Sequence, residues 1–64
     1  MRRSEAIRAA HTLAAESILD VHVWQHLDAL GGEGFYTAND HHLREIRREF
    51  PTKVRMVTTV KGQK

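Results

Sequence analysis

Two histidines four residues apart, His22 and His26, have the spacing of a metal-binding pair on a helix. A separation of four residues places two imidazoles on one helical face, where they can bind one Zn²⁺ or Ni²⁺ ion together. Asp40, His41 or His42 can complete such a site if a second helix packs alongside. The alternative is that His22, which lies in an apolar stretch, is a hydrogen-bonded core or interface histidine. Zinc is therefore a candidate ligand, and no other cofactor is expected.

No motif in the sequence indicates catalysis. There is no Cys, and no Ser or Thr lies in the context of a nucleophile elbow. The segment 31–34 (GGEG) lacks the Lys and the Ser or Thr of a phosphate-binding loop, and no Glu follows His22 as it does in the HExxH helix of metalloproteases. A chain of 64 residues also leaves little room for a substrate pocket of a few hundred Å³. We expect a protein that is not an enzyme.

The basic residues are concentrated in the second half of the chain. Residues 1–30 carry three Arg against four carboxylates, about −1 in net charge, whereas residues 31–64 carry seven Lys and Arg against four carboxylates, about +3. A positive surface attracts phosphate backbones, acidic proteins or anionic membranes. The residues expected to contact nucleic acid are Arg44, Arg47, Arg48, Lys53, Arg55 and Lys61.

We interpret this basic segment as a DNA-binding surface. A short helix with three Arg, followed by a basic strand and tail, resembles the layout of winged-helix nucleic-acid binders. In that layout Arg side chains contact phosphates or guanine, and lysines add contacts to the backbone. The alternative is an ordinary solvated helix on which Glu45 and Glu49 pair with neighbouring arginines. The expected function is a small DNA-binding regulator of bacterial or phage type.

The elements that position these residues begin with a helical segment. Ser4 is a suitable N-cap, and Glu5 lies in the first turn, where the helix dipole favours a negative charge. Helix-forming residues continue to Glu16, apolar residues recur at helical spacing beyond it, and Gly31-Gly32 is a typical stop. We predict a long helix over residues 4–30, bent or broken near 18–24.

Residues 18–24 (ILDVHVW) carry a competing pattern. They are rich in β-branched side chains, and Leu19, Val21 and Val23 alternate with more polar residues, which is typical of a half-buried strand. Because no Gly or Pro separates this stretch from the helix formers on either side, we favour the helix and keep the strand as the alternative.

The second half of the chain predicts shorter elements. A short strand is expected near 35–37, and the spacing of Leu43, Ile46 and Phe50 predicts an amphipathic helix over 40–50, ended by Pro51. Residues 54–60 predict a strand, which must pair with 35–37, with 18–24 or with a second copy of the chain. The expected fold is a single α+β domain over 1–64, either winged-helix-like or a small dimeric α+β domain.

Apolar residues of the first half exceed what so few elements can cover. A chain this short buries a modest core and has no Cys for disulfides, so association is the simplest further source of stability. We expect a homo-oligomer or a partner protein, with Trp24 as the main contact because aromatic residues dominate interfaces. This predicts a protein-binding inhibitor or adaptor as the second function. The expected interface residues are Leu19, Val23, Trp24, Leu27 and Leu30.

The location expected from the sequence is the cytoplasm. No apolar run approaches the roughly 20 residues that a membrane-spanning helix needs, and the basic N-terminus is not followed by the apolar core of a secretory signal. The lack of Cys fits a reducing compartment. We expect a complete chain with no membrane partner.

The stretch ILDVHVW resembles the opening strand of the cytoplasmic C-terminal domain of cation diffusion facilitator transporters. The elements predicted after it, a strand near Phe35, a helix over 41–50 and a strand over 54–60, are similar in order to the αββαβ domain of that family. The resemblance implies a dimeric metal-sensing domain, with His22 or the His41–His42 pair as ligands. This is the third function that we consider.

Overall fold

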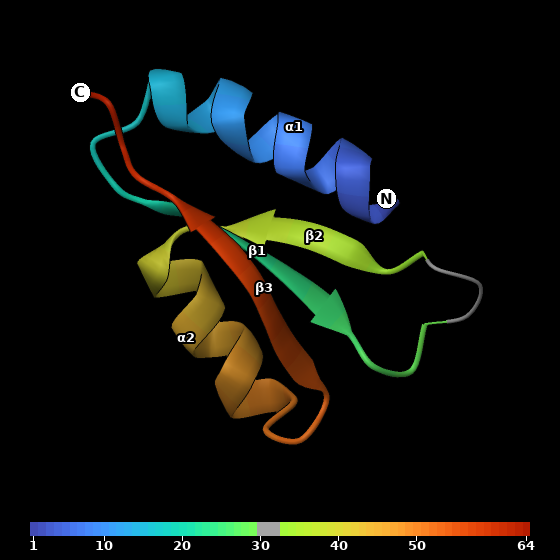
Figure 1. The fold of residues 1–64 in the computed structure, drawn as a ribbon. Helices are drawn as coiled ribbons and strands as arrows, with labels where there is room; N and C mark the ends of the chain where they lie inside the picture. Colours follow the sequence, from blue (N-terminus) through green and yellow to red (C-terminus); the bar gives the residue numbers. More distant parts are fainter. Residues whose placement is uncertain (30–32) are drawn as a thin grey trace.

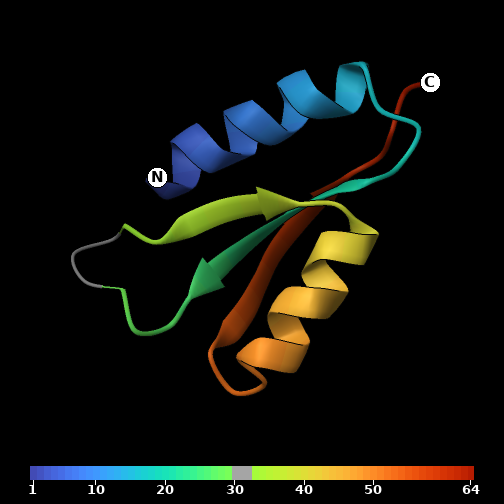
Figure 2. The ribbon, with the colours of Figure 1, turned by 180° about the vertical axis from the view of Figure 1, so that it is seen from behind.

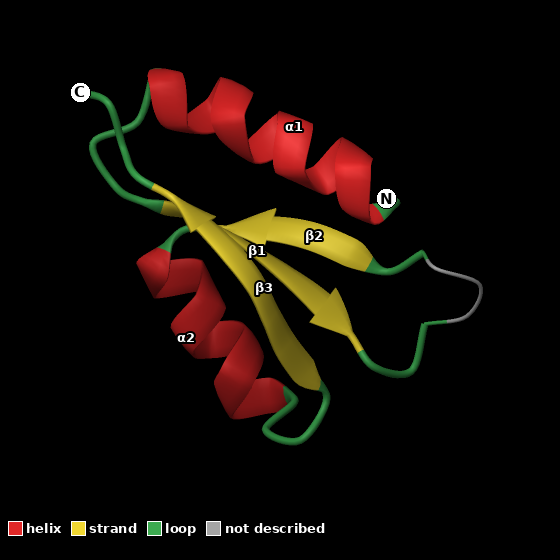
Figure 3. Cartoon of the chain, in the orientation of Figure 1, coloured by secondary structure: helices red, strands yellow, loops and turns green. Residues whose placement is uncertain are grey.

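The computed structural model describes residues 1–29 and 33–64. Within these residues the chain forms two helices and one three-stranded antiparallel sheet (Figures 1 and 3). The elements follow one another as α1 (Arg3–Ala15), β1 (Val21–His26), β2 (Phe35–Ala38), α2 (Asp40–Glu49) and β3 (Val54–Val60). The α+β class is therefore confirmed, as are the elements predicted after residue 34. Their order is also the αββαβ order that the resemblance implies.

The sheet has the strand order β2-β1-β3, so β1 is its central strand. Strand β2 pairs with β1 through matches such as Trp24 with Tyr36, and β3 pairs with the other edge of β1, from Val21 with Val60 to His26 with Val54. The register shifts between Val23 and Trp24, because Thr58 faces the first and Met56 the second. Val57 is thus the extra residue of a β-bulge, which bends an edge strand.

Alternation along β1 gives the sheet two apolar faces. Val21 and Val23 contribute to a core with α1, whereas Trp24 contributes to a second core with Leu43 of α2 and Ala38 of β2. Figure 2 shows α1 and α2 separated by the strands. A strand buried on both faces is rich in apolar residues, which explains Val21, Val23 and Trp24 but not the exposed Ile18 and Leu19 before the strand.

Alanines allow α1 to lie close to the sheet. Ala6, Ala10 and Ala14 recur every four residues and are fully buried against Val23 and Phe35. The helix begins at Arg3, and Glu5 Oε1 accepts a hydrogen bond of 3.1 Å from the Arg2 backbone N–H. Ser4 therefore lies inside the first turn, and the prediction that it is the N-cap is wrong.

The preferred prediction of helix over 18–24 is also wrong, and the strand alternative is confirmed for residues 21–24, since β1 begins at Val21. Helix α1 ends at Ala15, and C-terminal residues bond to carbonyl groups at and just beyond this end. The backbone N–H of Gln63 donates to Ala14 O at 2.9 Å, and that of Lys64 to Ser17 O at 3.1 Å. These bonds join residues almost fifty positions apart, so no local pattern contains them. The predicted stop at Gly31-Gly32 lies outside the described residues.

Helix α2 follows its sequence pattern closely. Asn39 Oδ1 accepts a hydrogen bond of 2.9 Å from the His42 backbone N–H, so Asn39 is the N-cap. Leu43 is buried, and the helix ends one residue before Phe50. After α2 comes β3, which pairs with β1 and forms no hairpin within the described residues. The winged-helix layout, which needs such a hairpin as its wing, is therefore not formed.

Neither of the helices in the described part of the chain is long and apolar enough to cross a membrane.

Candidate functional site

A hollow of about 590 Å³ lies beside α2 on the face of the sheet that this helix covers. This volume falls within the range of small-molecule sites. Its residues come from the central strand, from α2 and from the edge strand β3, so three elements meet around it. The lining side chains are His22, Asp40, Leu43, Arg44, Arg47, Met56 and Thr59. The hollow is an open depression on the surface of the domain, which the length of the chain alone did not predict.

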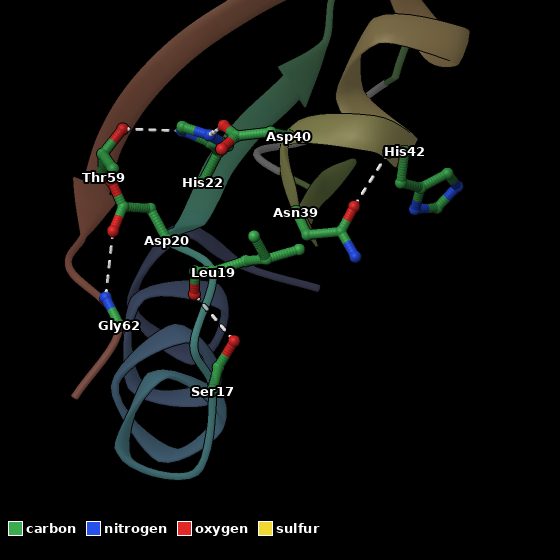
Figure 4. A network of polar contacts seen from close by, with 9 residues as sticks. All are labelled: Ser17, Leu19, Asp20, His22, Asn39, Asp40, His42, Thr59 and Gly62. Atoms are coloured by element: carbon green, nitrogen blue, oxygen red, sulfur yellow. Dashed lines mark hydrogen bonds and ion pairs between the residues drawn. The ribbon is translucent and has the colours of Figure 1, made fainter. Parts of the chain in front are cut away.

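A chain of polar contacts crosses this hollow. The Nδ1 atom of His22 lies 2.8 Å from Thr59 Oγ1, and its Nε2 atom is hydrogen-bonded to Asp40 Oδ1 (Figure 4). If Nε2 carries the proton, it donates to the carboxylate, and Nδ1 accepts from the Thr59 hydroxyl. The His22 side chain is 14% exposed and that of Asp40 is 53% exposed. These polar contacts therefore join the nearly buried His22 ring to the Asp40 carboxylate, which is partly exposed to solvent.

Three arginines occupy one flank of α2. With 3.6 residues per turn, Arg44, Arg47 and Arg48 lie within about 100° of arc around the helix. Arg44 and Arg47 line the hollow directly, and all three are exposed. We call these three residues the arginine flank.

The arginine flank is unpaired within the described residues. The ion pairs found there involve Asp28, Glu16, Glu33 and Asp40, and their basic partners are other residues than these three arginines. Glu45 and Glu49 are exposed but are not among these ion pairs. The ion pairs of Glu45 and Glu49 with the helix arginines are therefore not formed among the described residues, whereas the solvated position of the three arginines agrees with that alternative.

The floor of the hollow is apolar. Leu43 is 7% exposed, and Met56 packs against the same core as Trp24 and Ala38. A methionine side chain is flexible and polarizable, so it can adapt to a flat ligand. The hollow thus combines an apolar floor with positive charge on its helical wall and hydrogen-bonding groups along the chain of polar contacts.

The remaining basic residues of the predicted DNA-binding set lie elsewhere. Lys53 Nζ is paired with Asp28 Oδ1 at 3.0 Å, in the loop before β3. Arg55 pairs in register with Gln25 and lines a separate depression with Arg3 and Phe35, on the face covered by α1. Lys61 is exposed after the end of β3. The structure therefore brings Arg44 and Arg47 together with Arg48, but not with Lys53 or Arg55.

The predicted metal pair is not formed, because its premise of a helix is wrong. His22 and His26 lie on β1, where four residues span about 13 Å. His26 is engaged elsewhere: its ring lies 5.1 Å from that of Phe50, and its Nδ1 accepts a hydrogen bond of 3.2 Å from the Asp28 backbone N–H. Over residues 1–29 and 33–64, no three His, Cys, Asp or Glu side chains are placed to hold a metal ion. This includes the His41–His42 pair that the resemblance implies as ligands.

The residues of the predicted apolar interface do not form one surface. Val23 is fully buried and Trp24 is 6% exposed, so both belong to the interior of the domain. Leu19 and Leu27 are exposed at opposite ends of β1, and Leu30 lies outside the described residues. Trp24 therefore cannot be the main contact of a surface for a partner protein while the domain keeps this fold.

The link from His22 to Thr59 was missed because it depends on the strand register. Thr59 faces His22 across β1 and β3, and Asp40 reaches the same ring from the first turn of α2. The available signal was the alternation within ILDVHVW, which places His22 and Trp24 on one face of a strand. The side chains that contact this face, Thr59 and Asp40, are determined by how the strands and α2 pack in the folded chain.

Comparison of the chain with protein-family models, with curated proteins and with solved structures gives no match. The resemblance to the transporter domain therefore remains one of a seven-residue stretch and of the order of elements.

Proposed function

We propose that this chain is a nucleic-acid-binding domain that contacts phosphates through the arginine flank of α2. The observation that supports this most directly is the exposure of three unpaired guanidinium groups on one side of a ten-residue helix. Arginine binds phosphate with two parallel hydrogen bonds and is always charged, so it is well suited to this contact. Phosphate contacts are common to DNA and RNA, and they position a protein without selecting a sequence.

The surroundings of the flank favour a phosphate contact over a structural role. An arginine with a structural role is expected to form an ion pair with a carboxylate of its own domain, as Lys53 does with Asp28. Arg44 and Arg47 instead border an open hollow. The overall charge of +2 is small, so the attraction depends on this local concentration.

The test is fluorescence anisotropy with a labelled random-sequence DNA duplex at low salt. Affinity should fall as salt rises, with a slope near −0.9 for each phosphate that is neutralised, so about −2 to −3 for this flank. The variant Arg44→Ala/Arg47→Ala should lose most of the affinity. Its matched control is Arg8→Ala/Arg55→Ala, which removes the same charge from α1 and from the opposite face of the sheet.

Equal loss of affinity in the two double variants would show that net charge alone attracts the nucleic acid. Absence of binding by the unmodified protein to both duplex and single-stranded nucleic acid at low salt would overturn the proposal. Circular dichroism melting curves of each variant confirm that the comparison is made between folded proteins.

A further inference from the structure

Resting on the proposed function, we infer that the hollow between α2 and β3 receives one unstacked nucleotide, which makes single-stranded RNA the preferred ligand. The arginine flank explains only attraction to phosphate. The apolar floor and the Asp40 carboxylate are left without a role in that contact, although both line the same hollow as Arg44 and Arg47.

The floor favours a base whose face is uncovered. In a duplex the faces of the bases are stacked on one another, and a protein meets only their edges. A single strand can turn a base outward and place its face on an apolar or arginine side chain. The half-buried Met56 provides an apolar surface above the buried Leu43, and Arg44 and Arg47 border it. A duplex bound to the same arginines would leave this floor uncovered.

The size of the hollow agrees with one nucleotide. Along the helix axis Arg44 lies about 6 Å from Asp40, and Arg47 lies about 4.5 Å further on. Both guanidinium groups can therefore reach one phosphate while the attached sugar lies nearer the first turn of α2. The volume of about 590 Å³ falls within the range of sites that hold a small ligand of this kind.

The Asp40 carboxylate favours ribose over deoxyribose. A carboxylate beside two phosphate-binding arginines repels a bare anion, but it accepts hydrogen bonds from sugar hydroxyl groups. Its Oδ1 atom is bonded to His22, and no contact of Oδ2 is found within the described residues. The 2′-hydroxyl is the group that distinguishes RNA from DNA, and here it would meet an acceptor already held in place by the His22 ring.

The test compares four labelled probes of one sequence by fluorescence anisotropy: single-stranded RNA, single-stranded DNA, duplex RNA and duplex DNA. Single-stranded RNA should bind about tenfold more tightly than single-stranded DNA, as expected for one hydrogen bond to a charged acceptor. Asp40→Asn should reduce this ratio to about two or less. Arg44→Ala/Arg47→Ala should weaken binding to every probe, and Arg8→Ala/Arg55→Ala should weaken it much less.

A second measurement locates the ligand without any variant. The sequence contains two methionines, Met1 and Met56, and their methyl groups give separate NMR signals. Added single-stranded RNA should shift the Met56 methyl signal and leave that of Met1, whose amino group lies near Glu33 and which precedes α1, unchanged. Equal affinity for duplex DNA and single-stranded RNA, with an unshifted Met56 signal, would overturn this inference and leave the proposed function standing. Failure of every probe to bind would overturn both.

Discussion

His22 and Asp40 join the central strand of the sheet to the first turn of α2 through a direct hydrogen bond between their side chains. The same imidazole contacts Thr59 on the edge strand, so one ring connects three elements around the hollow. The buried core between α2 and the sheet is smaller than the one between α1 and the sheet. The His22 link therefore adds polar contacts to the apolar core that holds α2 against the sheet.

His22→Ala should destabilise the domain by about 2 kcal/mol, because it removes one hydrogen bond to a charged group and one to a hydroxyl. In a domain of this size that corresponds to a fall of roughly 10 °C in melting temperature. Thermal unfolding followed by circular dichroism measures the change.

The matched control for this substitution is His41→Ala, which removes an exposed histidine from the first turn of α2. It should leave the melting temperature within about 2 °C of the unmodified protein, as for other exposed positions. A similar small effect of His22→Ala would mean that the ring does not hold α2 in place.

Trp24→Ala should destabilise the domain by about 3–5 kcal/mol, since it opens a cavity between α2 and the sheet. The sequence predicted Trp24 as the main contact for a partner protein, whereas this side chain is only 6% exposed. Most of the molecules should be unfolded well below the melting temperature of the unmodified chain, because a small domain has little stability to lose. Urea titration with circular dichroism measures the loss.

Trp24→Phe is the comparison variant, because it keeps an aromatic ring of similar shape at this position. Within the described residues the indole Nε1 atom is buried without a hydrogen-bond partner, and leaving such a donor unsatisfied costs about 1–3 kcal/mol. Phenylalanine removes that donor along with part of the apolar area, so the net change should be within about 1 kcal/mol. A loss as large as that of Trp24→Ala would show that the indole N–H has an unrecognised role.

The sequence predicted best those elements whose limits are local. Helix α2 carries its own N-cap at Asn39, its inward-facing Leu43 and its stop at Pro51, and all three are used in the structure. The limit of α1 could not be predicted in this way, because the carbonyl groups of Ala14 and Ser17 are bonded by residues at the other end of the chain. Because the end of α1 was not predicted, the predicted helix extended through ILDVHVW. That error placed His22 and His26 on one helical face and led to the incorrect metal pair.

The candidate site was predicted only in part, for a related reason. Arginines 44, 47 and 48 could be grouped from the period of α2 alone. The placement of Thr59 opposite His22, and of Arg55 on the other face, depends on the pairing of β1 with β3 and on the bulge at Val57. A single extra residue in a strand changes which side chains face a helix, and nothing in residues 54–60 marks it beforehand.

Ala10→Leu should destabilise the domain, because it forces extra methylene groups between α1 and the sheet. Ala10 is fully buried in the stripe that faces Val23. Overpacking of this kind costs about 1–3 kcal/mol. Ala15→Leu is the matched control at the exposed last residue of α1 and should change stability by less than about 0.5 kcal/mol. Equal urea midpoints for the two variants would show that α1 can move away from the sheet at no cost.

Gly62→Ala should release the C-terminal residues from the end of α1. A Cβ atom at position 62 would lie 2.6 Å from the backbone oxygen of Ile18 and 2.7 Å from that of Ser17. These are backbone atoms of the segment between α1 and β1, so the contact cannot be relieved by rotating a side chain. The C-terminal segment must move away, and the bond of 3.0 Å from Gly62 N–H to Asp20 Oδ1 is lost with it (Figure 4).

The expected destabilisation is about 2 kcal/mol, since up to three backbone donors lose their partners at about 0.5–1.5 kcal/mol each. Hydrogen exchange gives the more specific measurement. The amides of Gln63 and Lys64, which donate to Ala14 and Ser17, should exchange much faster in Gly62→Ala. Gln63→Ala changes only a side chain bonded to the neighbouring Lys61 carbonyl and should leave that protection intact. Protected Gln63 and Lys64 amides in Gly62→Ala would show instead that residues 17–19 move to make room, and that these C-terminal bonds do not set the end of α1.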